Sequence, residues 1–142
     1  MSELELTINR RIPAPREKVF KAWLEPEMMA KFMRPPFGGV HGARAKTDAV
    51  KGGRFEVMML TPDKELPHTG TYLEIDPHSR LSFTWESASS LDDSVVTIDF
   101  AEPEAGVTDV TLHQVKFKSV GERDGHTAGW TAILELLEEN VA

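Results

Sequence analysis

Three residues near the C-terminal end of this chain combine chemically useful side chains with helical spacing. Arg123, His126 and Trp130 follow one another at intervals of three and four residues, which places them on one face of a helix. A guanidinium binds carboxylates, an imidazole exchanges protons near neutral pH, and an indole offers an apolar face with one donor. This face is therefore the first place where we would look for a ligand.

Two of these residues have alternative partners. Arg123 can pair with a ligand carboxylate, or with Glu74 or Glu86 from a strand, and we expect the internal pair because a buried charge is costly without a fixed partner. His126 can form a hydrogen bond that supports the loop before the helix, or it can line a cavity and contact a ligand. Both alternatives for His126 are consistent with the sequence.

Acid–base chemistry is the second possibility that the residue types suggest. Glu74 and Glu86 belong to strands that we expect to be neighbours, and two close carboxylates can act as general acid and base. Glu86, however, alternates with Trp85 and so faces away from it, which predicts exposure to solvent. An enzyme of the cyclase or hydrolase type would instead use His126, Tyr72 or Arg123, and we assign no catalytic residue.

Metal and nucleotide chemistry find no support in the motifs. The five histidines, at positions 41, 68, 78, 113 and 126, are not paired at a helical metal spacing, and the chain has no cysteine. No nucleophile elbow, phosphate-binding loop or dinucleotide fingerprint is present. We therefore expect neither a metal nor a cofactor.

Length and charge limit the remaining classes of function. The 142 residues fit one domain, residues 1–142, and 40% hydrophobic residues are enough for a core without disulfides. The net charge of −7 argues against nucleic acid or an anionic membrane as a partner. No apolar run reaches the ~18 residues of a membrane span, and the acidic N-terminus does not resemble a signal peptide. A cytoplasmic location is the expectation.

The elements that must position these residues are mostly strands. Alternating apolar residues predict strands near residues 3–12, 44–50, 54–59, 67–75, 81–86, 94–101 and 107–117. Two short helices follow the first strand, the first beginning at Pro15 and the second at Pro26. Because turn residues link most strands as hairpins, the pattern predicts a seven-stranded antiparallel sheet of the α+β class.

A long helix over residues 119–139 completes the chain. Ser119 and Glu122 have the spacing of a capping box, and an apolar stripe follows, with Trp130, Ile133, Leu134, Leu137 and Val141. Gly121, Gly125 and Gly129 recur on its flank, although glycine costs a helix interior about 1 kcal/mol relative to alanine. Close packing against a strand or loop explains them, with room for a ligand as the alternative.

Several short motifs, in order, resemble the SRPBCC (START-like, Bet v 1-like) superfamily, and within it the branch named after the activator of the heat-shock protein 90 ATPase. The matching segments are residues 14–23 with Pro26-Glu27, then 52–55, 70–75, 80–86, 108–112 and 123–130. The resemblance implies a helix-grip fold, in which the seven-stranded antiparallel sheet wraps the C-terminal helix and encloses a cavity. This chain departs from the branch's usual residues at Phe32-Met33-Arg34-Pro35 and at Gln114.

The interpretation favoured by these observations is a small-molecule binding protein with an apolar or amphipathic ligand between helix and sheet. The predicted ligand-binding residues are Trp23, Phe32, Phe37, Phe55, Tyr72, Phe83, Trp85, Gln114, Arg123, His126 and Trp130. The alternatives are an enzyme that uses the same cavity and a chaperone-associated domain of the ATPase-activator type. The strand pattern leaves a homodimer open.

Overall fold

The computed structural model describes residues 4–34, 40–87 and 90–141. Its first half contains β1 (Glu5–Ile12), α1 (Arg16–Ala22), α2 (Pro26–Phe32), β2 (Gly42–Thr47) and β3 (Arg54–Leu60). The remaining elements are β4 (Glu65–Asp76), β5 (Arg80–Thr84), β6 (Ser90–Glu104), β7 (Val107–Phe117) and α3 (Val120–Val141).

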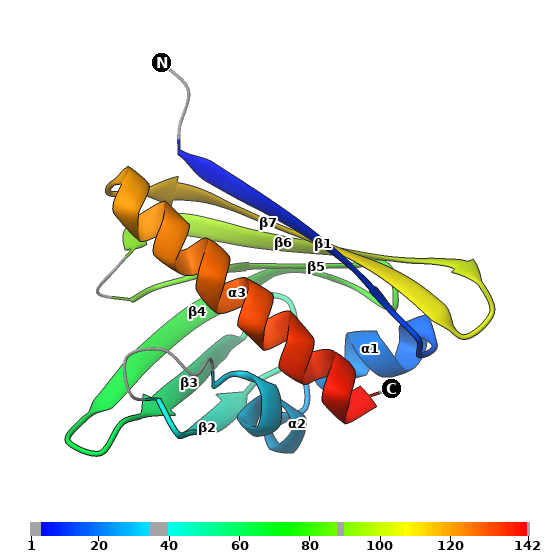
Figure 1. Ribbon diagram of the computed structural model, residues 1–142, viewed down its shortest axis with the longest axis horizontal. Helices are drawn as coiled ribbons and strands as arrows, with labels where there is room; N and C mark the ends of the chain where they lie inside the picture. The colour runs from blue at the N-terminus through cyan, green and yellow to red at the C-terminus, as the bar shows by residue number, and fades with distance from the viewer. Residues whose placement is uncertain (1–3, 35–39, 88–89, 142) are drawn as a thin grey trace.

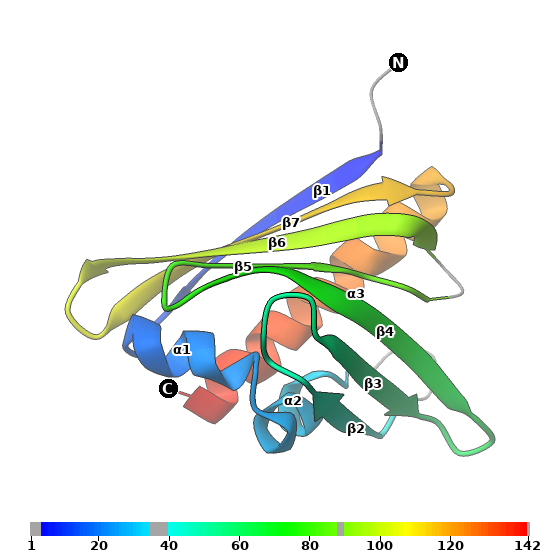
Figure 2. The ribbon, with the colours of Figure 1, turned by 180° about the vertical axis from the view of Figure 1, so that it is seen from behind.

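The strands form one seven-stranded sheet in the order β1-β7-β6-β5-β4-β3-β2, with every neighbouring pair antiparallel. The sheet curves around α3, which runs diagonally across its concave side (Figure 1). Seen from behind, the strands cover the helix, while α1 and α2 lie near its C-terminal end (Figure 2). The predicted α+β helix-grip fold, with two short helices after the first strand, is confirmed.

Period-two alternation explains which side chains face the helix. In β3, Phe55, Val57 and Met59 are buried, whereas the residues between them are partly exposed. Along α3, the predicted apolar stripe is buried from Trp130 to Val141. An ion pair between Arg10 and Glu138, with 2.9 Å between Nε and Oε1, joins β1 to the C-terminal half of this helix.

Two strands differ from the sequence pattern because of irregular pairing. In β4 the register shifts between Tyr72 and Glu74, so that Leu73 is an additional residue and is exposed. Simple alternation would put Glu74 on the same face as Tyr72, but after the bulge Glu74 is exposed. β6 begins at Ser90 rather than near residue 94, and its pairing with β7 is also shifted between Ser90 and Val95.

Gly70 permits a close approach in the middle of the sheet. It lies opposite Phe55 in the β3–β4 register, and a Cβ placed there would be 2.5 Å from the Phe55 ring. The same Cβ would be 2.0 Å from the carbonyl oxygen of Thr84. Glycine is therefore required where the aromatic ring covers the strand.

Candidate functional site

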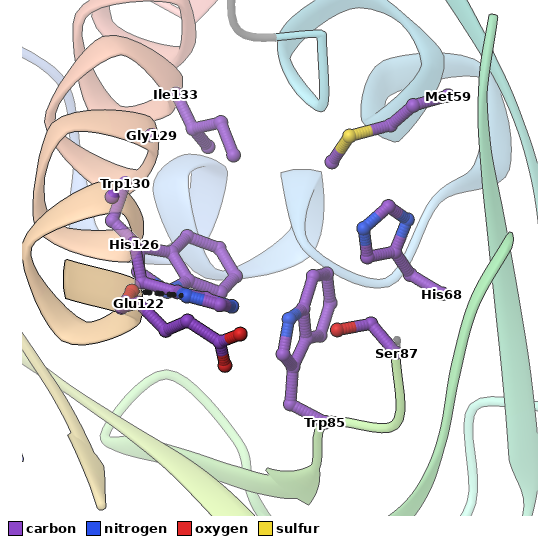
Figure 3. Close-up of a pocket in the computed structure, with 10 residues that line it drawn as sticks. Met59, His68, Trp85, Ser87, Glu122, His126, Gly129, Trp130 and Ile133 are labelled. Carbon is purple, nitrogen blue, oxygen red and sulfur yellow. Dashed lines mark hydrogen bonds between the residues drawn. The ribbon is translucent and has the colours of Figure 1, made fainter. Parts of the chain in front are cut away.

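A pocket with a volume of about 250 Å³ lies beside the N-terminal half of α3. Its helix side is lined by Glu122, Gly125, His126, Gly129, Trp130 and Ile133. The facing side is lined by Met59 of β3, His68 of β4, and Trp85 and Ser87, which follow β5. Figure 3 shows these two groups of side chains converging on the space between helix and sheet.

Two tryptophans separate this pocket from the aromatic core. The ring centroids of Trp85 and Trp130 are 4.9 Å apart, and both side chains are buried. Behind them, Trp23 contacts Trp130 at a centroid distance of 6.3 Å, and Phe55 stacks on Trp85 at 6.2 Å. The indoles therefore form both an apolar wall of the pocket and the edge of the core.

A buried chain of hydrogen bonds fixes Trp130. Its Nε1 donates to Oε1 of Gln114 over 2.7 Å, and Nε2 of Gln114 donates to Oγ of Ser94 over 2.9 Å. Oγ of Ser94 in turn donates to the carbonyl oxygen of Val115 over 2.6 Å. Gln114 is fully buried, so its amide is committed to positioning the indole and does not line the pocket.

His126 presents one ring nitrogen to the pocket. Its Nδ1 lies 2.8 Å from the carbonyl oxygen of Glu122, and because a carbonyl only accepts, Nδ1 carries the proton of the neutral ring. Nε2 is then an acceptor, and it points into the pocket (Figure 3). Phe117 packs against the ring at a centroid distance of 5.1 Å. The hydrogen bond of His126 is thus made within the helix and not to the loop before it, and the side chain also lines the cavity.

His68 faces His126 from the opposite wall. Its Nδ1 lies 3.0 Å from the carbonyl oxygen of Leu66, which makes Nδ1 the donor, and its ring is tilted against Trp85 at 5.1 Å. Burial lowers the pKa of His68, and the nearby His126 lowers it further. Backbone hydrogen bonds to Leu66 and Val57 act in the opposite direction. The ring is therefore neutral at neutral pH, with Nε2 on the pocket side (Figure 3).

Glu122 turns its carboxylate into the pocket. Oγ of Ser119 accepts a hydrogen bond from the Glu122 amide over 3.1 Å, which is one half of the predicted capping box. The reciprocal half is not made: Oε2 of Glu122 is buried and has no hydrogen-bond partner among the described residues. The carboxylate instead extends from α3 toward Trp85 (Figure 3).

The glycines of α3 leave space. A Cβ built on Gly125 or Gly129 would meet no described atom within 4 Å beyond the helix's own neighbouring backbone, and both residues line the pocket. For the part of the chain that the structure describes, the close-packing interpretation of these two glycines is wrong. Their missing side chains widen the pocket.

The other predicted aromatic residues lie deeper. Trp23, Phe55, Tyr72 and Phe83 surround a separate small space in the core that has no room for a water molecule. Phe32 is fully buried, with its ring 5.0 Å from that of Trp23. Phe37 lies outside the described residues.

Two polar atoms in this deeper cluster lack partners. Nε1 of Trp23 and the hydroxyl of Tyr72 are buried and form no hydrogen bond with any described residue. Burial raises the pKa of Tyr72 well above its usual range, with a smaller contribution from Asp48. Tyr72 is therefore a neutral core residue, away from the pocket.

The charge pairs expected near the site are arranged differently. Arg123 is paired with its neighbour Asp124 at 3.2 Å and is partly exposed, so the predicted pair with Glu74 or Glu86 is wrong. Its guanidinium is held by Asp124, and the residues of α3 that line the pocket include Glu122 and His126 but not Arg123.

Glu86 has a structural role in the sheet. It pairs with Arg54, with Oε2 of Glu86 2.9 Å from Nη1 of Arg54, and accepts hydrogen bonds from Thr69 and Thr84. The hydrogen bond from Arg54, with those of the two threonines, lowers the pKa of Glu86. Since Glu74 is exposed in β4, the two carboxylates do not form a catalytic pair.

Seven pocket residues were absent from the predicted set: Met59, His68, Ser87, Glu122, Gly125, Gly129 and Ile133. One signal could have found His68, which shares the strand face of Gly70 and Tyr72 by simple alternation. Because the sequence predicts a capping role for Glu122, it gives no reason to expect the Glu122 carboxylate in the pocket. Of the predicted residues, the pocket brings together Trp85, His126 and Trp130.

Residues 4–34, 40–87 and 90–141 contain neither a metal site nor a membrane-spanning helix. No group of three or more histidine, aspartate or glutamate side chains there is arranged to hold a metal ion. None of the helices there is both long and apolar enough to cross a membrane.

Comparison with known proteins identifies the family. The family described as "Activator of Hsp90 ATPase homolog 1-like protein" matches residues 13–142, so the chain belongs to this family, a branch of the SRPBCC superfamily. The predicted resemblance is confirmed. A search of curated proteins finds no match.

Solved structures share the fold over nearly the whole chain. A crystal structure of a Chromobacterium violaceum protein is 26% identical, with 96% of each chain covered and a TM-score of 0.81. An Aeromonas hydrophila protein of the same family is 26% identical, covers 96% of this chain and 90% of its own, and has a TM-score of 0.72. A Plasmodium falciparum protein described as an HSP90 activator is 19% identical, with 95% and 94% covered and a TM-score of 0.76.

Proposed function

We propose that this protein binds a small amphipathic molecule in the pocket beside α3. The observation that carries the proposal is the combination of an apolar wall, made by Trp85 and Trp130, with polar atoms of Glu122, His68 and His126 that face the same space. Ligand sites are concave, mostly apolar, and carry a few convergent polar groups. The pocket has this composition.

The volume limits the size of the ligand. A dry cavity of about 150 Å³ accommodates one benzene molecule, so a pocket of about 250 Å³ admits a one- or two-ring body with a short polar substituent. A long lipid chain would need the space that Trp23, Phe55 and Phe83 now fill. The proposal is therefore a compact ligand.

The predicted ligand-binding residues take different parts in this proposal. Trp85, His126 and Trp130 contact the ligand directly. Gln114 acts through the hydrogen bond to Trp130. The buried rings of Trp23, Phe32, Phe55, Tyr72 and Phe83 support the two indoles from behind.

Filling the pocket tests the proposal. Native mass spectrometry of freshly purified protein should detect a bound small molecule, or small amphipathic compounds should raise the melting temperature. Gly129→Leu places a side chain in the pocket and should abolish both signals, whereas Gly129→Ala adds one methyl group and serves as the control. If Gly129→Leu bound the same compounds as the original protein, the pocket would not be the binding site.

Activation of an Hsp90-type ATPase is a second candidate. It is supported by the description of the family and by that of the Plasmodium falciparum structure, which at 19% identity shares the fold. The test is an ATPase assay of an Hsp90-type chaperone with and without the purified protein. Unchanged turnover at saturating protein would remove this candidate and leave the ligand-binding proposal standing.

A further inference from the structure

We propose that the ligand of this pocket carries a cationic amine, which donates hydrogen bonds to Glu122. The inference rests on the proposed function and names the chemical class of the molecule that is bound. It leaves no part for the alternative in which Arg123 pairs with a ligand carboxylate, since Arg123 is paired with Asp124 and does not line the pocket.

The first argument is the condition of the Glu122 carboxylate. Its Oε2 is buried at the pocket, and across the described chain it has neither a hydrogen-bond donor nor a salt-bridge partner. A buried acceptor left unpaired is destabilising, and more so when it is charged. An ammonium group on the ligand would supply both the donor and the opposite charge.

The second argument is the polarity of the neighbouring groups. Nδ1 of His126 and Nδ1 of His68 donate to backbone carbonyl oxygens, so each ring turns an accepting Nε2 toward the pocket. Nε1 of Trp130 is committed to Gln114. With Glu122, the two histidines form a set of three acceptors that matches a ligand with several N–H donors.

The third argument is the absence of positive charge. None of the described residues that line the pocket is lysine or arginine. A carboxylate or phosphate ligand would therefore meet Glu122 with no compensating cation. An ammonium group would also lie near the indoles of Trp85 and Trp130, whose π faces attract cations.

Three probes with the same apolar body test the inference. Binding of 2-phenylethylamine, 2-phenylethanol and phenylacetate is measured by isothermal calorimetry or by quenching of tryptophan fluorescence at neutral pH. The amine should bind about tenfold or more tightly than the alcohol, and the carboxylate should bind most weakly. Equal or reversed affinities would overturn the inference.

A pair of helix variants isolates Glu122. Glu122→Gln should reduce the amine's affinity about tenfold while leaving that of the alcohol within about twofold. Glu135→Gln removes the same charge from an exposed position of α3 and should change neither. If Glu122→Gln left the preference for the amine intact, Glu122 would not be the anchor.

The outcomes separate this inference from the proposed function. Binding of the neutral alcohol without preference for the amine would reject the amine head and keep the binding pocket. Failure of all three probes, together with the absence of a co-purified molecule, would reject the binding function itself. The comparison of the three probes on the unaltered protein does not depend on the folding of any variant.

Discussion

Trp130 of α3 donates from Nε1 to Oε1 of Gln114 in β7, and this 2.7 Å bond joins the wall of the pocket to the centre of the sheet. The bond is fully buried and continues through Ser94. Because the indole also contacts Trp85 and Trp23, its orientation decides where the pocket ends and the core begins.

Gln114→Leu should lower the free energy of unfolding by about 1–3 kcal/mol, because it leaves the buried Nε1 of Trp130 without an acceptor. Urea denaturation measures this change. His113→Gln, one residue earlier on the more exposed face of β7, is the matched control and should change stability far less. An equal loss of unfolding free energy for both substitutions would show that the buried hydrogen bond contributes nothing to stability.

A double-mutant cycle sharpens the same prediction. Trp130→Phe removes the donor. The double variant with Gln114→Leu should therefore lose less free energy of unfolding than the two single variants lose together. Strict additivity of the two free-energy changes would mean that the residues are not coupled.

Tyr72→Phe should raise the free energy of unfolding by about 1 kcal/mol. The Tyr72 hydroxyl is buried without a partner among the described residues, so its removal relieves a desolvation cost while the ring packing is retained. Thermal or urea denaturation provides the measurement. A loss of stability would show that the hydroxyl has a hydrogen-bond partner in solution.

The raised pKa of Tyr72 makes a separate prediction about alkaline pH. Burial disfavours the phenolate, so the folded state keeps its proton beyond the ordinary pKa of about 10. The associated stability is fully present below that pH and is lost as the pH rises toward the folded-state pKa. Because Tyr72 is the sole tyrosine, ultraviolet absorbance should show phenolate only as the chain unfolds. Phenolate at pH 10 in folded protein would contradict this.

The fold was predictable from the sequence because it depends on residue types whose spacing repeats. Phe55, Val57 and Met59 alternate, and Trp130 to Val141 follow a helical period, so the buried face of each element can be predicted from the sequence. Tyr72 and Glu74 show where this reasoning stops, because a bulge at Leu73 breaks the alternation and nothing in the local residue types announces it.

The candidate site was less predictable because it depends on the direction of individual side chains and on which of several possible partners each one binds. Arg123 has the spacing of a pocket residue, yet its guanidinium pairs with Asp124 and it does not line the pocket. In the sequence, the capping box alone accounts for a glutamate at position 122, so nothing points to a second role for Glu122. Only the structure shows that its side chain points into the pocket.

His68 should make the protein sensitive to mild acid. Burial lowers its pKa in the folded state, so its contribution to stability is present above the unfolded value of about 6.5 and is lost as the pH falls through the folded-state pKa. The free energy of unfolding should therefore decrease as the pH falls below about 6.5. Urea denaturation at several pH values measures the slope.

The His68→Gln variant should reduce this slope, because glutamine does not titrate. His41→Gln removes an exposed histidine and should leave the slope unchanged. An unaltered slope in His68→Gln would assign the acid sensitivity to other groups.

Gly125→Ala should stabilise the protein by up to about 1 kcal/mol, because alanine favours a helix interior and its methyl group meets no described atom within 4 Å. Gly70→Ala is the contrasting change: its Cβ would fall 2.0 Å from the carbonyl oxygen of Thr84, so it should destabilise the sheet strongly. Thermal denaturation of both variants provides the comparison. If Gly125→Ala were destabilising, the space beside this residue would be filled in solution. If it is stabilising, the chain keeps glycine there at a cost to the helix, which is the result expected when open space in the pocket serves binding.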